Sequence, residues 1–118
     1  MVTRATQLGW RGEQIARRFL ERRGLRFLHQ HVRTRLGEVD LVMKDGKTIV
    51  FIEVKTRSNR SFGLPEEAVT PKKLKRTYAA ATQYLLDHGW SNRDCRVDVV
   101  VVERSKISMV RYYQGISG

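Results

Sequence analysis

The sequence has one cysteine, two prolines, few acidic residues and no long apolar run. The single cysteine, Cys95, excludes an internal disulfide and matches no cysteine-based metal site. No apolar run approaches the ~18 residues of a membrane span, and the first residues contain no apolar signal-peptide segment. Neither an internal repeat nor a long flexible linker divides the chain, so residues 1–118 are expected to form one domain. We therefore expect a soluble, cytoplasmic, single-domain protein.

Acidic residues are scarce relative to basic ones. The chain has 12 Asp and Glu against 23 Lys and Arg, which gives a net charge of +11. Such a surface attracts phosphate backbones, and the 16 arginines suit bidentate phosphate contacts. No helix pairs a broad apolar face with a purely basic one, so a membrane surface is disfavoured as the partner. The charge favours nucleic acid, with basicity that serves solubility alone as the alternative.

Periodicity predicts two helices and five strands in a mixed sheet, which is an α/β fold. One helix runs from Gln7 to Arg23 and ends at Gly24, and a second begins at Thr70-Pro71 and ends at Gly89. The expected strands are Arg26–Val32, Glu38–Lys44, Thr48–Thr56, Val97–Glu103 and Ser108–Gln114. The third is apolar on both faces and should be central, whereas the last should lie at an edge.

The second and third strands should form a hairpin. Asp45-Gly46 is a strong turn signal. As a two-residue turn it would place Asp40 opposite Phe51, with Asp40 and Glu53 as diagonal neighbours ~7–8 Å apart. Two carboxylates at that separation can share a divalent cation.

The expected burial of Glu53 indicates that this pair of carboxylates has a cationic partner. Glu53 lies in an apolar strand, and leaving a charge unpaired there would cost several kcal/mol. Its repulsion with Asp40 should raise at least one pKa, and Lys55 should relieve part of that repulsion. Mg²⁺, which prefers oxygen ligands and takes one or two carboxylates, would relieve more. The alternative is a structural Glu–Lys pair.

Several basic residues could hold a phosphate backbone. Arg33, Arg35, Arg57 and Arg60 flank the open end of the hairpin. Lys72 and Lys73 make the first turn of the second helix basic, against the preference of the helix dipole for negative charge. An anionic ligand would explain both groups, and a solvated face is the alternative.

Histidines and aromatic residues are expected to have simpler roles. His29 and His31 alternate on one strand face without a third metal ligand nearby, so they read as surface or phosphate-contacting residues. Asp98 should pair with a nearby arginine. Four aromatic residues are expected in the core rather than as base-stacking platforms: Trp10, Tyr78, Tyr84 and Trp90.

Asp40, followed after twelve residues by Glu53-Val54-Lys55, resembles the PD-(D/E)XK active site of the restriction-endonuclease-like superfamily. The closer resemblance is to the YraN family of small bacterial endonuclease-like proteins. It is carried by Gly12-Glu13, Gly37-Glu38-Val39-Asp40-Leu41, the run from Phe51 to Arg57, and Arg96-Val97-Asp98-Val99-Val100. Archaeal Holliday-junction resolvases are similar in their helix Glu, hairpin Asp and Glu-x-Lys. Val39 departs from the motif, whose name has proline there.

The resemblance implies a restriction-endonuclease-like fold and phosphodiester hydrolysis, on DNA rather than RNA and on branched or structured DNA in particular. Asp40, Glu53 and the Val54 carbonyl would bind Mg²⁺ or Mn²⁺. Lys55 would orient or deprotonate the attacking water, and Glu13 would assist the metal or a second one. Junction-cutting relatives pair two active sites, so the resemblance also allows a homodimer. The alternatives are a non-catalytic nucleic-acid-binding module and a protein-interaction adaptor.

Overall fold

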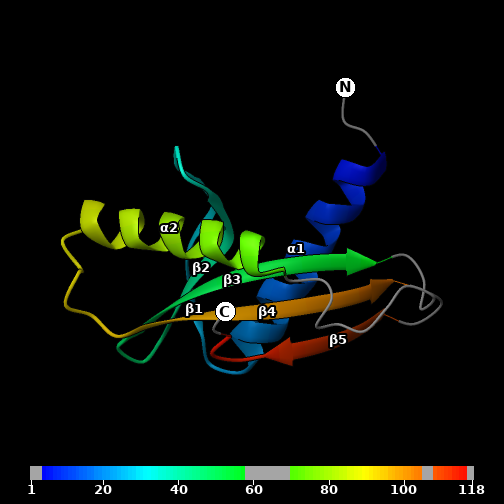
Figure 1. Ribbon diagram of the computed structural model, residues 1–118. Coiled ribbons are helices and arrows are strands. Elements are labelled where there is room, and N and C mark those ends of the chain that lie inside the picture. The colour runs from blue at the N-terminus through cyan, green and yellow to red at the C-terminus, as the bar shows by residue number, and fades with distance from the viewer. Residues whose placement is uncertain (1–3, 58–69, 105–107, 117–118) are drawn as a thin grey trace.

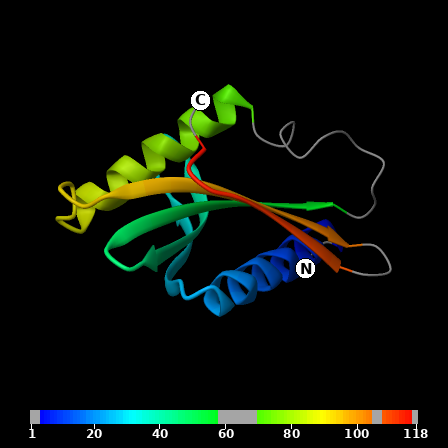
Figure 2. The same ribbon diagram turned by 90° about the horizontal axis from the view of Figure 1, so that it is seen from below.

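The protein is a central sheet with one helix on each face. The computed structural model describes residues 4–57, 70–104 and 108–116, and for residues 4–9, 104 and 108 it describes the backbone alone. Its elements are α1 (Arg4–Arg22), β1 (Arg26–Arg33), β2 (Glu38–Asp45), β3 (Thr48–Arg57), α2 (Pro71–Asp87), β4 (Cys95–Arg104) and β5 (Ser108–Tyr113). Figure 1 shows these elements, and the turned view in Figure 2 places α1 and α2 on opposite faces of the sheet.

The sheet is mixed, as the sequence predicts. Its five strands follow chain order, with β3 in the centre and with β1 and β5 at the edges. All pairs are antiparallel except β3 and β4, which run parallel. The parallel pair is possible because the connection between β3 and β4 includes α2, as such crossovers require. This arrangement is compatible with a restriction-endonuclease-like fold.

Two apolar clusters hold the helices on the sheet. Leu20 of α1 packs with Val50 and Ile52 on one face. On the other face, Leu85 of α2 packs with Phe51. Because β3 contributes large apolar side chains to both clusters, its backbone is fixed from two sides, which makes it a rigid base for the side chains near its end.

Glycines end both helices, as predicted. Gly24 and Gly89 have φ of 95° and 68°. The amide of Leu25 donates to the Leu20 carbonyl, and the amide of Trp90 donates to the Leu85 carbonyl. These bonds close the last turn of each helix in a Schellman motif. At the start of α2, the Thr70 side chain accepts from the Lys73 amide and caps the helix.

The predicted turn between β2 and β3 is displaced by one residue. Asp45 pairs with Thr48, so the two turn residues are Gly46 and Lys47. Gly46 has a φ of 61°, which a glycine adopts readily at the first position of a two-residue hairpin turn. The prediction that Asp40 lies opposite Phe51 is therefore wrong, since Phe51 pairs with Val42.

No helix in the described part of the chain is both long enough and apolar enough to cross a membrane.

Candidate active site

Asp40 and Glu53 lie where β2 and β3 separate. The pairing of these strands ends at Leu41 and Ile52, and one step further in the same register places Asp40 beside Glu53. There the Asp40 Oδ2 accepts a hydrogen bond of 2.8 Å from the Val54 amide. The Asp40 side chain thus satisfies the Val54 amide, which lies beyond the last paired residues of the two strands. In the corrected register the two carboxylates lie just beyond the last paired residues, Leu41 and Ile52, instead of diagonally across paired strands.

Glu53 is a buried carboxylate with one unsatisfied oxygen. Its side chain is 11% exposed, and Oε1 lies 3.6 Å from Nζ of Lys73 on α2. The other oxygen, Oε2, is buried and has no hydrogen-bond partner among the described residues. Unpartnered buried oxygens are rare because they lose their hydration without compensation. This oxygen is therefore a candidate to coordinate a bound cation.

Burial makes both carboxylates hard to ionise. Loss of hydration, together with the nearby Glu13 carboxylate, raises the pKa of Asp40 to about 6, against the opposing hydrogen bond from Val54. Loss of hydration and the charge of Asp40 raise the pKa of Glu53 to about 7, against the attraction of Lys73. Such carboxylates, crowded and dehydrated, are stabilised by any cation that can reach both.

Glu13 reaches this region from α1. Its side chain is 15% exposed, and its Oε1 and Oε2 lie 2.8 and 2.6 Å from Nε2 of His31. His31 has a φ of 53°, and among the described residues other than glycine it is alone in having a positive φ. A left-handed backbone at such a residue is uncommon, and it is held here by the contact with Glu13.

The left-handed backbone at His31 also changes where the histidines point. His29 Nδ1 lies 2.7 Å from the hydroxyl of Tyr84 on α2, whereas His31 contacts Glu13 on α1. The two side chains therefore lie on opposite faces, and the prediction that they share one face is wrong. Strand alternation between the two histidines fails because the positive φ at His31 interrupts the regular strand.

The lysine that pairs with the carboxylates is not the one that the sequence predicts. Lys73, expected to face an anionic ligand, forms the ion pair with Glu53. Lys55 is half-buried on β3 and forms no ion pair among the residues that the structure describes. The Lys55 ammonium can therefore interact with another group, such as a bound anion.

The expected phosphate-contacting residues do not gather at one place: Arg33 and Arg35 line a hollow with residues near the end of α2, whereas Lys72 lies at its start. Arg33 is 82% exposed and lies 3.8 Å from Glu38, and Arg35 is exposed on the turn between β1 and β2. Lys72 is exposed on the first turn of α2, and Arg57 is half-buried at the end of β3. Arg60 lies outside the described residues.

The carboxylates fit a divalent cation that takes part of its ligands from water. Asp40, Glu53 and the Val54 carbonyl can supply hard oxygens, and over the described segments Oε2 of Glu53 has no hydrogen-bond partner. Over residues 4–57, 70–104 and 108–116, no three Asp, Glu, His or Cys side chains already gather in metal-binding geometry. Two carboxylates plus waters are, however, the donor set typical of Mg²⁺.

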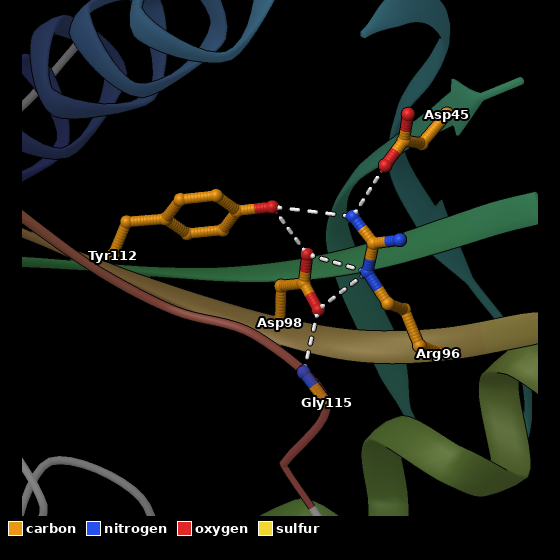
Figure 3. A network of polar contacts seen from close by, with 5 residues as sticks. All are labelled: Asp45, Arg96, Asp98, Tyr112 and Gly115. Atoms are coloured by element: carbon orange, nitrogen blue, oxygen red, sulfur yellow. Dashed lines mark hydrogen bonds and ion pairs between the residues drawn. The ribbon is translucent and has the colours of Figure 1, made fainter. Parts of the chain in front are cut away.

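Asp98 belongs to a different, structural network. It is fully buried, and it accepts from Arg96 Nε at 3.1 Å, the Tyr112 hydroxyl at 2.6 Å and the Gly115 amide at 2.9 Å (Figure 3). Arg96 also donates to Asp45 at 3.0 Å. The prediction that Asp98 pairs with an arginine is confirmed. Burial and the bond to Asp98 raise the pKa of Tyr112 to about 12.

Two of the aromatic residues expected in the core are not there. Tyr84 is buried and Trp90 is half-buried, but Trp10 is 48% exposed and Tyr78 is exposed with its hydroxyl on the Ile116 carbonyl. The roles of His31 and Lys73 were also missed by sequence reasoning. Lys73 lies one turn before the buried Thr77 of α2, so the helical periodicity could have indicated that it faces the sheet.

The fold and the site define a class of small α/β proteins compatible with the restriction-endonuclease-like fold, in which Asp40 of β2 interacts with the buried Glu53 of the central strand. Within that class, the chain belongs to the family UPF0102, also called YraN. The sequence model described as "Uncharacterised protein family UPF0102" matches residues 12–102.

Relatives in this family cover most of the chain. It is similar to a UPF0102 protein of Beutenbergia cavernae, with 45% identity over 104 residues that make up 88% of each chain. A UPF0102 protein of Anaeromyxobacter dehalogenans is 48% identical over 80% of this chain and 71% of its own. One from Chlorobium phaeobacteroides is 46% identical over 80% of this chain and 75% of its own.

Proposed function

We propose that this protein is a divalent-metal-dependent endonuclease that hydrolyses phosphodiester bonds of DNA. The observation that carries the proposal is the pair formed by half-buried Asp40 and buried Glu53, whose carboxylates are crowded and dehydrated while Oε2 of Glu53 has no partner among the residues that the structure describes. A purely structural pair would be expected to satisfy both oxygens, because leaving one unsatisfied costs stability.

Each residue has a role that follows from its place. Asp40, Glu53 and the Val54 carbonyl would hold Mg²⁺ or Mn²⁺, which when bound polarises the phosphate and acidifies a water molecule. Lys55 would orient the attacking water and stabilise charge on the phosphate. Glu13, held by His31, would bind a second cation or its water shell.

The reaction is the addition of water across one phosphodiester bond. The water oxygen bonds to phosphorus, the bond from phosphorus to one ester oxygen breaks, and that oxygen takes up a proton as the water loses one. Exposed Arg33, Arg35 and Lys72 would hold the flanking phosphates, consistent with the net charge of +11. The charge does not distinguish DNA from RNA, and the preference for DNA rests on the resemblance to DNA-cutting relatives.

Cleavage assays with matched variants test the proposal. Wild-type protein is incubated with supercoiled plasmid, linear duplex and a four-way junction, each with Mg²⁺, with Mn²⁺ or with EDTA. We expect metal-dependent cleavage of at least one substrate, reduced by at least about 100-fold in Asp40→Asn and Glu53→Gln. Glu38→Gln is the control, because Glu38 is an exposed carboxylate on the same strand as Asp40.

Two outcomes would contradict the proposal. Cleavage that is equal in wild type and Asp40→Asn would assign the activity to a contaminant or another site. Salt-sensitive DNA binding with no cleavage under any metal condition would instead identify a non-catalytic nucleic-acid-binding module.

A further inference from the structure

A hollow lies beside the carboxylate site, between α1 and the β1–β2 hairpin. Its volume is about 480 Å³, which is within the range of small-molecule sites. Its lining comes from three elements: Trp10, Glu13, Gln14 and Arg17 of α1, Gln30 and His31 of β1, and Leu41 of β2.

Glu13 links the hollow with the carboxylate site. Glu13 of α1 lines the hollow and its charge acts on Asp40, and His31 of β1, which contacts Glu13, lines the hollow as well. Leu41 lines the hollow and directly follows Asp40 in the chain. A ligand in the hollow would therefore lie on the Glu13 side of a group bound at Asp40.

The lining combines a flat apolar surface with unpaired amides. Trp10 is 48% exposed, so its indole supplies the apolar surface of the hollow, whereas Leu41 is almost fully buried and adds little to it. Within the described part of the chain, neither Gln14 nor Gln30 uses its side-chain amide in a hydrogen bond. Each amide can both donate and accept.

The charges around the hollow disfavour an anionic ligand. The Glu13 carboxylate is in its wall. The Arg17 guanidinium lies 3.7 Å from the centre of the Phe27 ring and 3.4 Å from Glu21, so it already has an aromatic and an acidic neighbour. A phosphate would meet Glu13, whereas a purely apolar ligand would leave two amides dehydrated without partners.

A neutral, flat, heteroaromatic group with donors and acceptors on its edge meets all these conditions. We propose that the hollow binds one unpaired nucleobase of a DNA strand, stacked on Trp10 and hydrogen-bonded by Gln14 and Gln30. The proposal rests on the proposed function and deepens it, because it makes DNA with a base outside the helical stack the preferred substrate. The displaced base would lie across Glu13 from a phosphate bound at Asp40.

Binding measurements without catalysis test the inference. Fluorescence anisotropy in EDTA compares three DNAs of equal length: a perfect duplex, the same duplex with one unpaired nucleotide, and the same duplex with an abasic site at that position. We expect wild type to bind the DNA with the unpaired base about tenfold more tightly than either other DNA, as base–aromatic stacking provides.

Substitutions at the exposed aromatic residue sharpen the test. Trp10→Ala should lose this preference and leave affinity for the perfect duplex unchanged, and Trp10→Phe should retain most of it. Leu86→Ala is the matched control, because Leu86 is another large exposed apolar residue, located on α2. Gln30→Ala should reduce the preference without removing it.

Two results would overturn the inference. One is equal binding of the unpaired-base and abasic DNAs by wild type, which needs no variant. The other is an equal loss of affinity for all three DNAs in Trp10→Ala. Failure of the nuclease proposal is distinguishable, since Asp40→Asn should keep the base preference whether or not wild-type protein cleaves DNA.

Discussion

Replacing Glu53 by glutamine should stabilise the protein at alkaline pH in the absence of metal. Burial and repulsion raise the pKa of Glu53 from 4.5 to about 7. One pKa unit corresponds to ~1.4 kcal/mol, so ionising Glu53 costs about 3 kcal/mol more in the folded protein than in the unfolded chain. A glutamine side chain avoids that cost, because it carries no charge at any pH.

The pH dependence follows from the sign of the pKa change. The folded protein holds the Glu53 proton more tightly than the unfolded chain does, and so does Asp40. This contribution to stability is complete below about pH 4 and is lost as the pH rises through about 7. The stability difference between Glu53→Gln and wild type should therefore be near zero at pH 4 and reach about 2–3 kcal/mol at pH 8.

Urea unfolding at pH 4, 6 and 8 in EDTA measures this difference, with Glu38→Gln as the control. Glu38 is 62% exposed, and its weak ion pair with Arg33 contributes at most ~1 kcal/mol. Adding Mg²⁺ at pH 8 should then stabilise wild type and not Glu53→Gln. A destabilised Glu53→Gln at pH 8 in EDTA, or a difference that does not change with pH, would refute the reasoning.

Two further substitutions test contacts that position the site. Gly37→Ala should destabilise the protein by about 1–3 kcal/mol in urea unfolding, because the new Cβ would overlap the backbone carbonyl of Arg76 on α2, which cannot rotate away. Stability equal to wild type would show that the hairpin can move off the helix. Asp98→Asn should cost about 3–5 kcal/mol, because it leaves the charge of Arg96 without its buried partner. Thermal unfolding measures that loss, and an unchanged midpoint would contradict the role assigned to the network in Figure 3.

The sequence predicts the elements of the fold well because their signals are local. Gly24 and Gly89 end the helices at the positions that the helix-end rules give, and Thr70 with Pro71 begins α2. The apolar runs place β3 in the centre because only a central strand can bury both of its faces. Each of these signals lies within a few residues of the feature that it determines.

The arrangement within the site depends on contacts between distant segments. The turn can form around Gly46 in two registers, and the choice decides whether Asp40 lies beside Glu53 or diagonal to it. The left-handed backbone of His31 is coupled to a carboxylate on α1, eighteen residues earlier in the chain. The ion pair of Lys73 with Glu53 exists because α2 packs over this face of the sheet. None of these contacts has a local sequence signal strong enough to predict it.

The single parallel pair in the sheet bears on the order of folding. Strands β1, β2 and β3 are consecutive and joined by short turns, whereas β4 meets β3 only after the chain segment of residues 58–94 has been closed into a loop. Loop closure costs more entropy as the segment lengthens, so we expect the three-stranded meander to form first. Folding rates of core variants can check this order: substitutions in β2 should slow folding, and substitutions in β5 should mainly speed unfolding. The two carboxylates would then be side by side before the helix that brings Lys73 arrives, so that for part of the folding reaction their repulsion is opposed by solvent and dissolved cations alone.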